Sequence, residues 1–188
     1  MNNKTKTLVG IALFTAIVAV LQFVGGGIKF SAFSISLVLV PIVVGSALYG
    51  WKAGAWLGFV FGVVVLLSGD AAAFLAINVP ATIGVVLVKG LCCGLAAGLI
   101  YKALEKLNAY VAVFGAAIIC PVVNTGIFLL GCRFFFLETV SQWGAALGFE
   151  NAASYMFLGL AGVNFLVELG VNIVLAPVIV RLIRIGKK

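Results

Sequence analysis

The amino-acid sequence predicts an all-α integral membrane protein with six transmembrane helices, and three observations support this fold class. Hydrophobic residues make up 64% and charged residues 9% of the 188 residues, and the mean hydropathy is +1.31. Soluble domains are about half apolar and about one quarter charged. The apolar residues also fall into separate stretches of helical length, and the basic residues cluster between them and at both ends. This distribution is typical of membrane topology rather than of nucleic-acid binding.

The expected spans cover about residues 7–24, 35–49, 53–67, 79–101, 110–132 and 155–183 of a single membrane domain at residues 1–188. Lys4 and Lys6 precede the first span, as they would in a signal peptide. Its apolar run is longer than a signal-peptide core and no clear cleavage site follows, so we expect a retained first helix. The second span is short and contains Pro41, so we expect it to be kinked or tilted.

Glycine spacing distinguishes the third and fourth spans. Glycines recur every four residues in both, at Gly54, Gly58 and Gly62 and at Gly90, Gly94 and Gly98. Such spacing leaves a smooth face that admits close helix contact, so each helix is expected to pack tightly against a partner, with the other as one candidate. Pro80 suits the first turn of the fourth helix. Within the longest connection, residues 139–147 are expected to form an amphipathic helix at the interface.

The basic residues predict the topology. An even number of spans puts both termini on one side, together with Lys4, Lys6, Lys52, Lys102, Lys106, Arg181, Arg184, Lys187 and Lys188. The opposite side holds only Lys29 and Arg133, while Lys89 lies inside a span. The positive-inside rule therefore predicts cytoplasmic termini in the cell membrane, with the longer and more aromatic connections outside.

Several chemistries are unsupported. The chain has no histidine, and its four cysteines form no C-x-x-C pair, so we expect neither a metal site nor a catalytic histidine. No G-x-x-x-x-G-K-[ST] sequence is present, so the chain is not expected to bind ATP through a P-loop. We therefore predict no catalytic residues, no cofactor and no enzymatic activity.

Polar residues inside the spans are the candidate substrate-binding groups: Lys89, Asn124, Asn164, Glu168 and Asn172. A charged residue in the membrane is costly and usually has a function or a partner. Asn164, Glu168 and Asn172 follow an i, i+4, i+8 spacing, which puts them on roughly one helix face. Lys89 and Glu168 either line a binding cavity or neutralise each other as a structural pair, and the asparagines have interhelical hydrogen bonding as their alternative role.

The candidate substrate-binding residues differ in their expected depth in the membrane. At 1.5 Å per residue, Lys89 lies about 13 Å along its helix and Glu168 about 20 Å along the last one. We therefore expect Lys89 and Asn164 to be ligand groups ahead of Glu168. In the connection at residues 134–149, Phe135 and Trp143 are the candidate lid over a ligand, and an interfacial aromatic belt is the alternative.

The sequence resembles the substrate-binding S components of energy-coupling factor (ECF) transporters along nearly its whole length. The resemblance rests on Ala12-x-x-x-Ala16, on SLVLVPIVVGSALYGWKAGAWLGFVFG at residues 36–62, on KGLCCGLAAGLIYK at residues 89–102 and on NFLVELGVNIVLAP at residues 164–177. It implies a small six-helix membrane protein that captures a vitamin or related micronutrient from outside.

The resemblance also implies partners. In this family a small-residue stripe on the first helix contacts a transmembrane coupling subunit, and two ATPase subunits power that subunit. The matching positions here are Ala12 and Ala16. The general pattern is similar to the group that includes pantothenate, cobalamin and folate carriers, and Lys89 favours a carboxylate-bearing vitamin such as pantothenate.

Two other functions stay open at this point. The first is a helix-packing scaffold subunit of a membrane complex, in which Lys89 and Glu168 would pair. The second is a stand-alone small-solute transporter, although the chain has no repeated half of the kind that many secondary transporters carry.

Overall fold

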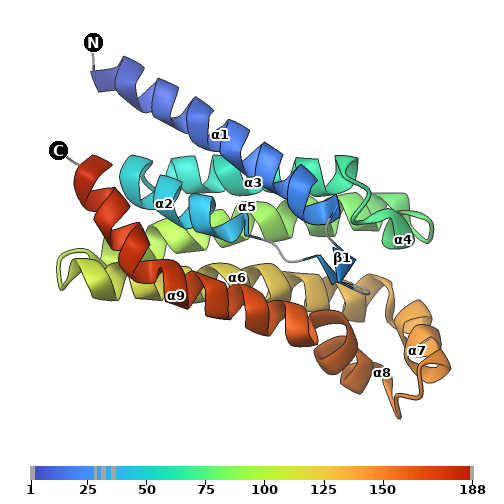
Figure 1. The fold of residues 1–188 in the computed structure, drawn as a ribbon. Coiled ribbons are helices and arrows are strands. Elements are labelled where there is room, and N and C mark those ends of the chain that lie inside the picture. The colour runs from blue at the N-terminus through green and yellow to red at the C-terminus, as the bar shows by residue number, and fades with distance from the viewer. Residues whose placement is uncertain (1–2, 28, 31–32, 35–36, 187–188) are drawn as a thin grey trace.

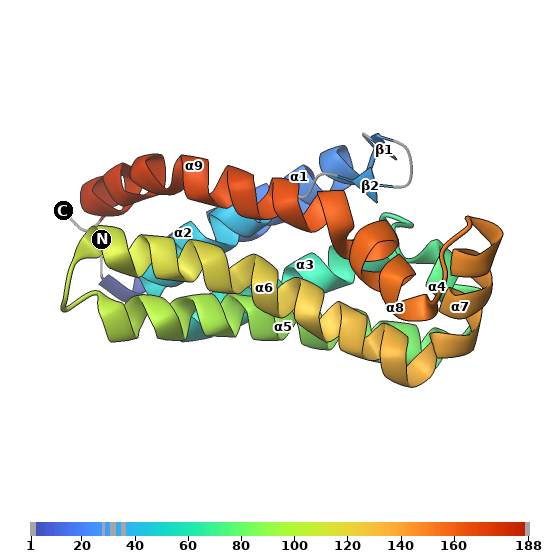
Figure 2. The same ribbon diagram turned by 90° about the horizontal axis from the view of Figure 1, so that it is seen from below.

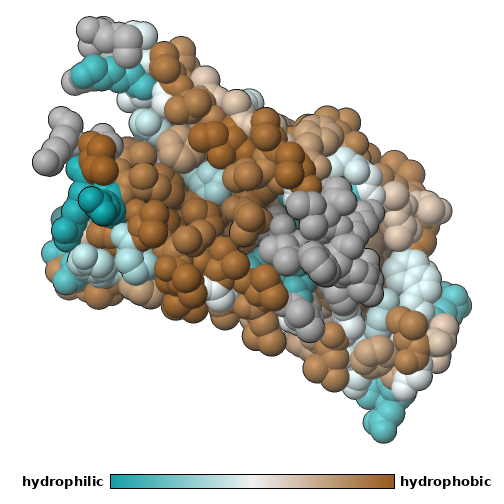
Figure 3. All heavy atoms as spheres, viewed as in Figure 1, coloured by the Kyte–Doolittle hydropathy of each residue, from teal (hydrophilic) through white to brown (hydrophobic). Residues whose placement is uncertain are grey.

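The computed structural model describes residues 3–27, 29–30, 33–34 and 37–186, and Figure 1 shows them as an elongated bundle of helices. The long apolar helices are α1 (Asn3–Gly27), α2 (Leu39–Tyr49), α3 (Trp51–Leu67), α5 (Val79–Leu104), α6 (Ala109–Phe135) and α9 (Val163–Gly186). Each matches one predicted span, so the all-α class is confirmed. Hydrophobic side chains cover the middle of the face drawn in Figure 3, and hydrophilic ones gather toward the two ends.

The apolar helices differ in length. Among the described residues, four segments are long and apolar enough to cross a membrane: Lys4–Gly25, Val79–Leu104, Ala109–Phe135 and Ala152–Ile185. Leu39–Tyr49 and Trp51–Leu67 are shorter apolar helices. Pro41 lies in the first turn of α2, where the missing N–H costs nothing, so the proline marks the start of this helix and does not kink its middle.

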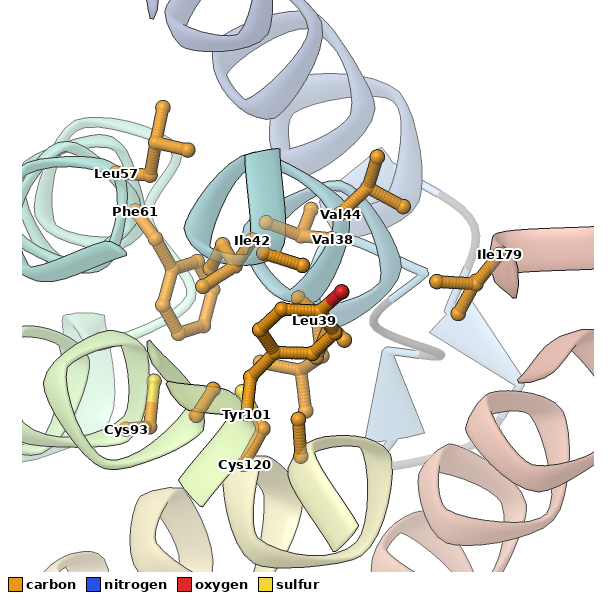
Figure 4. Packing of buried hydrophobic residues seen from close by; sticks show 14 of the residues in the cluster. Val38, Leu39, Ile42, Val44, Leu57, Phe61, Cys93, Tyr101, Cys120 and Ile179 are labelled. Carbon is orange, nitrogen blue, oxygen red and sulfur yellow. The ribbon is translucent and has the colours of Figure 1, made fainter. Parts of the chain in front are cut away.

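Helix α2 forms the centre of the bundle. Its residues 41–47 are all buried. Figure 4 shows Leu39 and Ile42 surrounded by side chains from α3, α5, α6 and α9, among them Phe61 and Ile179. Gly50, with φ of 89°, permits the tight reversal from α2 into α3.

Helices α3 and α5 pack with their backbones in contact. An added Cβ at Gly54, Gly58 or Gly62 would meet the main chain of α5, and one at Gly90 or Gly94 would meet the main chain of α3. This result agrees with the predicted glycine faces and identifies the two helices as each other's partner.

The longer connections gather at one end of the bundle, and the short α2–α3 and α5–α6 turns lie at the other. Both termini lie at one end, and the opposite end carries the hairpin of β1 (Lys29–Phe30) and β2 (Phe33–Ser34), α4 (Ala72–Leu75), α7 (Leu137–Ala146) and α8 (Ala152–Ser154) (Figures 1 and 2). Helix α7 corresponds to the amphipathic helix predicted at residues 139–147. Pro80 lies in the first turn of α5, as predicted, and the Asn78 side chain accepts a hydrogen bond from Ala81 N.

The last span starts near residue 155 as predicted, but the sequence did not predict the π-helical form of its first turns. It begins as a π-helix, η1 (Tyr155–Gly162), before it becomes α9. A π-helix hydrogen-bonds from i to i+5 and therefore has wider turns than an α-helix. Such segments occur frequently at functional sites.

Candidate functional site

A cavity of about 240 Å³ lies in the half of the bundle opposite the termini. The C-terminal halves of α3 and α6, the N-terminal half of α5, and η1 with the start of α9 enclose it. Its polar lining residues include Gln22, Asp70, Thr82, Lys89, Asn124, Thr125, Tyr155, Asn164 and Glu168. Its aromatic lining residues include Phe61, Phe74, Phe128 and Phe136. Four of the five predicted substrate-binding residues therefore line one cavity.

Lys89 is the basic residue in this lining, and two aromatic rings flank it. Its Nζ atom lies 5.6 Å from the centroid of Phe61 and 5.5 Å from that of Phe128. Both distances fall within the range of cation–π attraction. Lys89 follows Val88 and precedes Gly90, whose contact with α3 holds this turn of α5 against the helix that carries Phe61. The glycine contact therefore positions the lysine at the cavity wall.

The polar residues of the last span are linked along the helix by hydrogen bonds between residues four apart. Asn164 Nδ2 donates to Glu168 Oε1 at 3.2 Å, and Asn172 Nδ2 donates to the main-chain oxygen of Glu168 at 2.8 Å. The i, i+4, i+8 face expected from the sequence is therefore present. Asn172 is buried one turn beyond the cavity and does not line it, and its amide hydrogen bond lies within its own helix.

Buried acceptors remain unpaired around the cavity. Asn124 Oδ1, Asn164 Oδ1 and Glu168 Oε2 have no hydrogen-bond partner among the described residues. Lys89 and Glu168, both within the described part of the chain, are not hydrogen-bonded to each other. Leaving a buried acceptor unpaired costs about 1–3 kcal/mol, and more for a charged group. These atoms can therefore receive donors from a bound molecule.

Lys89 and Glu168 line the same cavity, although the sequence count placed them at different depths. That count assumed an α-helical rise from Tyr155 onward, whereas the wider turns of η1 advance less along the axis per residue.

Five of the polar lining residues were not selected by the sequence analysis, and two of these, Gln22 and Asp70, are hydrogen-bonded to each other. Gln22 Nε2 donates to Asp70 Oδ2 at 2.6 Å, which ties the end of α1 to the turn before α4. Gln22 is the one glutamine in the first apolar stretch, and this isolated polar residue was the available signal. No comparable feature of the sequence pointed to Asp70, its hydrogen-bond partner 48 residues away.

The comparison with protein families gave one result. The sequence model described as "ECF transporter, substrate-specific component" matches residues 6–180. The chain belongs to this family. Comparisons with curated proteins and with solved structures gave no match. Family membership makes the protein a multi-pass transporter subunit of the cell membrane with a small-molecule substrate, and it confirms the resemblance drawn from the sequence.

The aromatic residues of this S component cluster at the outer rim of the cavity. Phe74 makes edge-on contacts with Phe128, Phe136 and Trp143, at centroid distances of 5.5, 5.1 and 5.5 Å. Of the two residues predicted as a lid, Trp143 stacks behind Phe74 and does not line the cavity. Phe135 is 58% exposed and faces an outer groove between α5 and α6. The sequence analysis missed Phe74 and Phe136, which do line the cavity.

The predicted docking residues of the S component lie on the outer surface of α1. Ala12 and Ala16 are both exposed, while Val18 is fully buried. Helix α1 is bound to α3 by a hydrogen bond in which Trp56 Nε1 donates to Thr15 Oγ1 at 3.1 Å. The two alanines therefore lie on an exposed face of α1.

Proposed function

We propose that this S component binds a small carboxylate-bearing vitamin, with pantothenate as the leading candidate, in the cavity at Lys89. The observation that carries the proposal is a lysine that forms no hydrogen bond to a carboxylate of the described residues and is held between two aromatic rings in a cavity inside a membrane bundle. An ammonium group at this depth is costly without a partner. A ligand carboxylate supplies that partner.

The size of the cavity supports a small vitamin. Its volume of about 240 Å³ is slightly below the roughly 300–1,000 Å³ of typical ligand pockets. Cobalamin and folate are larger than pantothenate, so the cavity favours pantothenate among the three. The unpaired amide and carboxylate oxygens suit the hydroxyl and amide groups of pantothenate.

The orientation and partners complete the proposal. With six spans and cytoplasmic termini, the cavity lies in the outer half of the membrane. The exposed alanine face of α1, at Ala12 and Ala16, docks with a transmembrane coupling subunit that two ATPase subunits power. The whole chain acts as one domain, captures the vitamin from outside and delivers it to this module. The scaffold alternative requires a Lys89–Glu168 pair, and the missing hydrogen bond between them argues against it.

A thermal-shift screen of the detergent-purified chain against water-soluble vitamins tests this proposal. A ligand that binds only the folded state raises the apparent melting temperature by mass action. We expect pantothenate to raise it in the native chain and in Lys102→Met, an exposed control near the termini. We expect a clearly smaller shift in Lys89→Met. The absence of a shift with every vitamin tested would reject the proposed binding function.

A further inference from the structure

We infer that the cavity binds its ligand in one fixed orientation, with the carboxylate at Lys89 and hydroxyl or amide N–H donors at Glu168 and Asn124. This inference rests on the proposed function, since it requires that the cavity is the vitamin site. It adds a second recognition element on the wall formed by α6 and α9. It therefore defines the ligand as a molecule with one acidic end and one hydrogen-donating end.

Donors and acceptors occupy different walls of the cavity. Lys89 lies on α5 and faces the rings of Phe61 and Phe128. The unpaired acceptors Asn124 Oδ1 and Glu168 Oε2 lie on α6 and α9. Glu168 is 3% exposed and Asn124 is 6% exposed, so bulk water does not solvate either group freely. A ligand that leaves either acceptor unpaired therefore binds less tightly.

The position of the Glu168 carboxylate is set by its neighbours. Asn164 occupies Oε1, and Asn172 binds the main-chain oxygen of the same residue. The Asn164 contact holds the side chain while Oε2 stays available at the cavity. Asn164 is therefore a positioning residue for Glu168 as well as part of the lining.

The charge distribution excludes the reverse orientation. A ligand carboxylate placed against Glu168 Oε2 would meet a like charge in a site of low dielectric constant. A dicarboxylate meets the same repulsion with its second acidic group. The site therefore favours a monocarboxylate that also carries neutral donors.

The test combines two ligand analogues with two variants. The probes are pantothenate, its alcohol pantothenol, and the pantothenate analogue in which both hydroxyls are replaced by hydrogen. Calorimetry measures their affinities for the purified native chain, Lys89→Met and Glu168→Gln. In the native chain, both analogues are expected to bind about tenfold to a hundredfold more weakly than pantothenate, as for the loss of a hydrogen bond to a charged group.

The two variants test which side of the cavity binds the carboxylate and which binds the hydroxyl groups of the ligand. Lys89→Met is expected to abolish the preference for pantothenate over pantothenol and to keep the preference for the hydroxylated ligand. Glu168→Gln replaces a charged acceptor by a weaker neutral one, so it is expected to reduce the preference for the hydroxylated ligand and to keep the preference for pantothenate over pantothenol. If either variant weakens all three probes by the same factor, or if the two patterns are exchanged, the inference is overturned while the binding function stands.

The native chain alone also decides the question if a variant does not fold. Equal affinity for pantothenate and its hydroxyl-free analogue would overturn the second recognition element without any substitution. Failure of every vitamin in the screen to bind would overturn the proposed function, and this inference with it.

Discussion

Gly58 of α3 and Gly90 of α5 lie so close that a Cβ on either residue would overlap with the main-chain carbonyl oxygen of the other. No larger residue fits at this contact without separating the two helices. The contact is adjacent to Lys89 in sequence and one turn from Phe61, so it also sets the distance between the lysine and the ring that faces it. The close contact of Gly54, Gly58 and Gly62 with α5 and of Gly90 and Gly94 with α3, here called the glycine seam, therefore affects both the packing of the fold and the geometry of the cavity.

The first prediction concerns this seam. Gly90→Ala is expected to lower the free energy of unfolding by about 1–3 kcal/mol, as for overpacking of a close contact. Gly84 lies on the same helix with no atom within 4 Å of an added Cβ, so Gly84→Ala is the matched control. The control is expected to stabilise the helix by about 0.5–1 kcal/mol, because alanine loses less backbone entropy than glycine. Thermal unfolding in detergent measures both changes, and a stabilising effect of both substitutions would contradict the seam.

The glycine seam was also the part of the fold that the sequence specified best. Spacing of four residues in two neighbouring spans defines a face in each helix, and a face is sufficient to predict close packing. The π-helix η1 had no such signal, because its residues have the same apolar composition as an α-helical span.

The cavity was predictable only in part. Lys89, Asn124, Asn164 and Glu168 stand out because polar residues are rare in apolar spans. The aromatic residues of the rim do not stand out, because phenylalanine is abundant throughout the chain. Which of Phe74, Phe135 and Phe136 faces inward depends on how α4, α6 and α7 are rotated, and that rotation is a property of tertiary packing.

The second prediction concerns the rim. Phe74→Ala removes edge-on contacts with Phe128, Phe136 and Trp143 and is expected to cost about 3 kcal/mol of stability, at the lower end for Phe→Ala. It is also expected to weaken pantothenate binding, because Phe74 lines the cavity. Phe135→Ala is the control, with an expected change within about 0.5 kcal/mol at this exposed position. The rim assignment is wrong if Phe135→Ala weakens binding more than Phe74→Ala does.

The third prediction concerns the tie between Gln22 and Asp70. A hydrogen bond to a charged group contributes about 1.5–3 kcal/mol, so a double-mutant cycle with Gln22→Leu and Asp70→Leu is expected to show a coupling energy of this size. Glu138 is exposed on α7, so the cycle of Gln22→Leu with Glu138→Leu serves as the control and should give additive changes. Additive changes in the first cycle would show that the tie does not stabilise the fold.

The fourth prediction concerns transport. Ala12→Trp and Ala16→Trp each put a large ring on the exposed face of α1. Vitamin binding by the purified variants should therefore equal that of the native chain. Uptake by cells that also express the coupling subunit and the ATPases should fall by at least tenfold, because the ring separates two helices that meet through small residues.

A substitution on a remote lipid-facing surface separates docking from general damage. Val174 of α9 is 74% exposed and lies on a different helix from the alanine face, so Val174→Trp is the matched control. It adds a ring of the same size at a position that faces lipid in the proposed arrangement, and uptake should stay at the native level. Loss of uptake in Val174→Trp, or normal uptake in both alanine variants, would move the docking surface away from α1. Loss of uptake together with loss of binding would instead locate the damage in the fold, so the two readouts must be measured on the same variants.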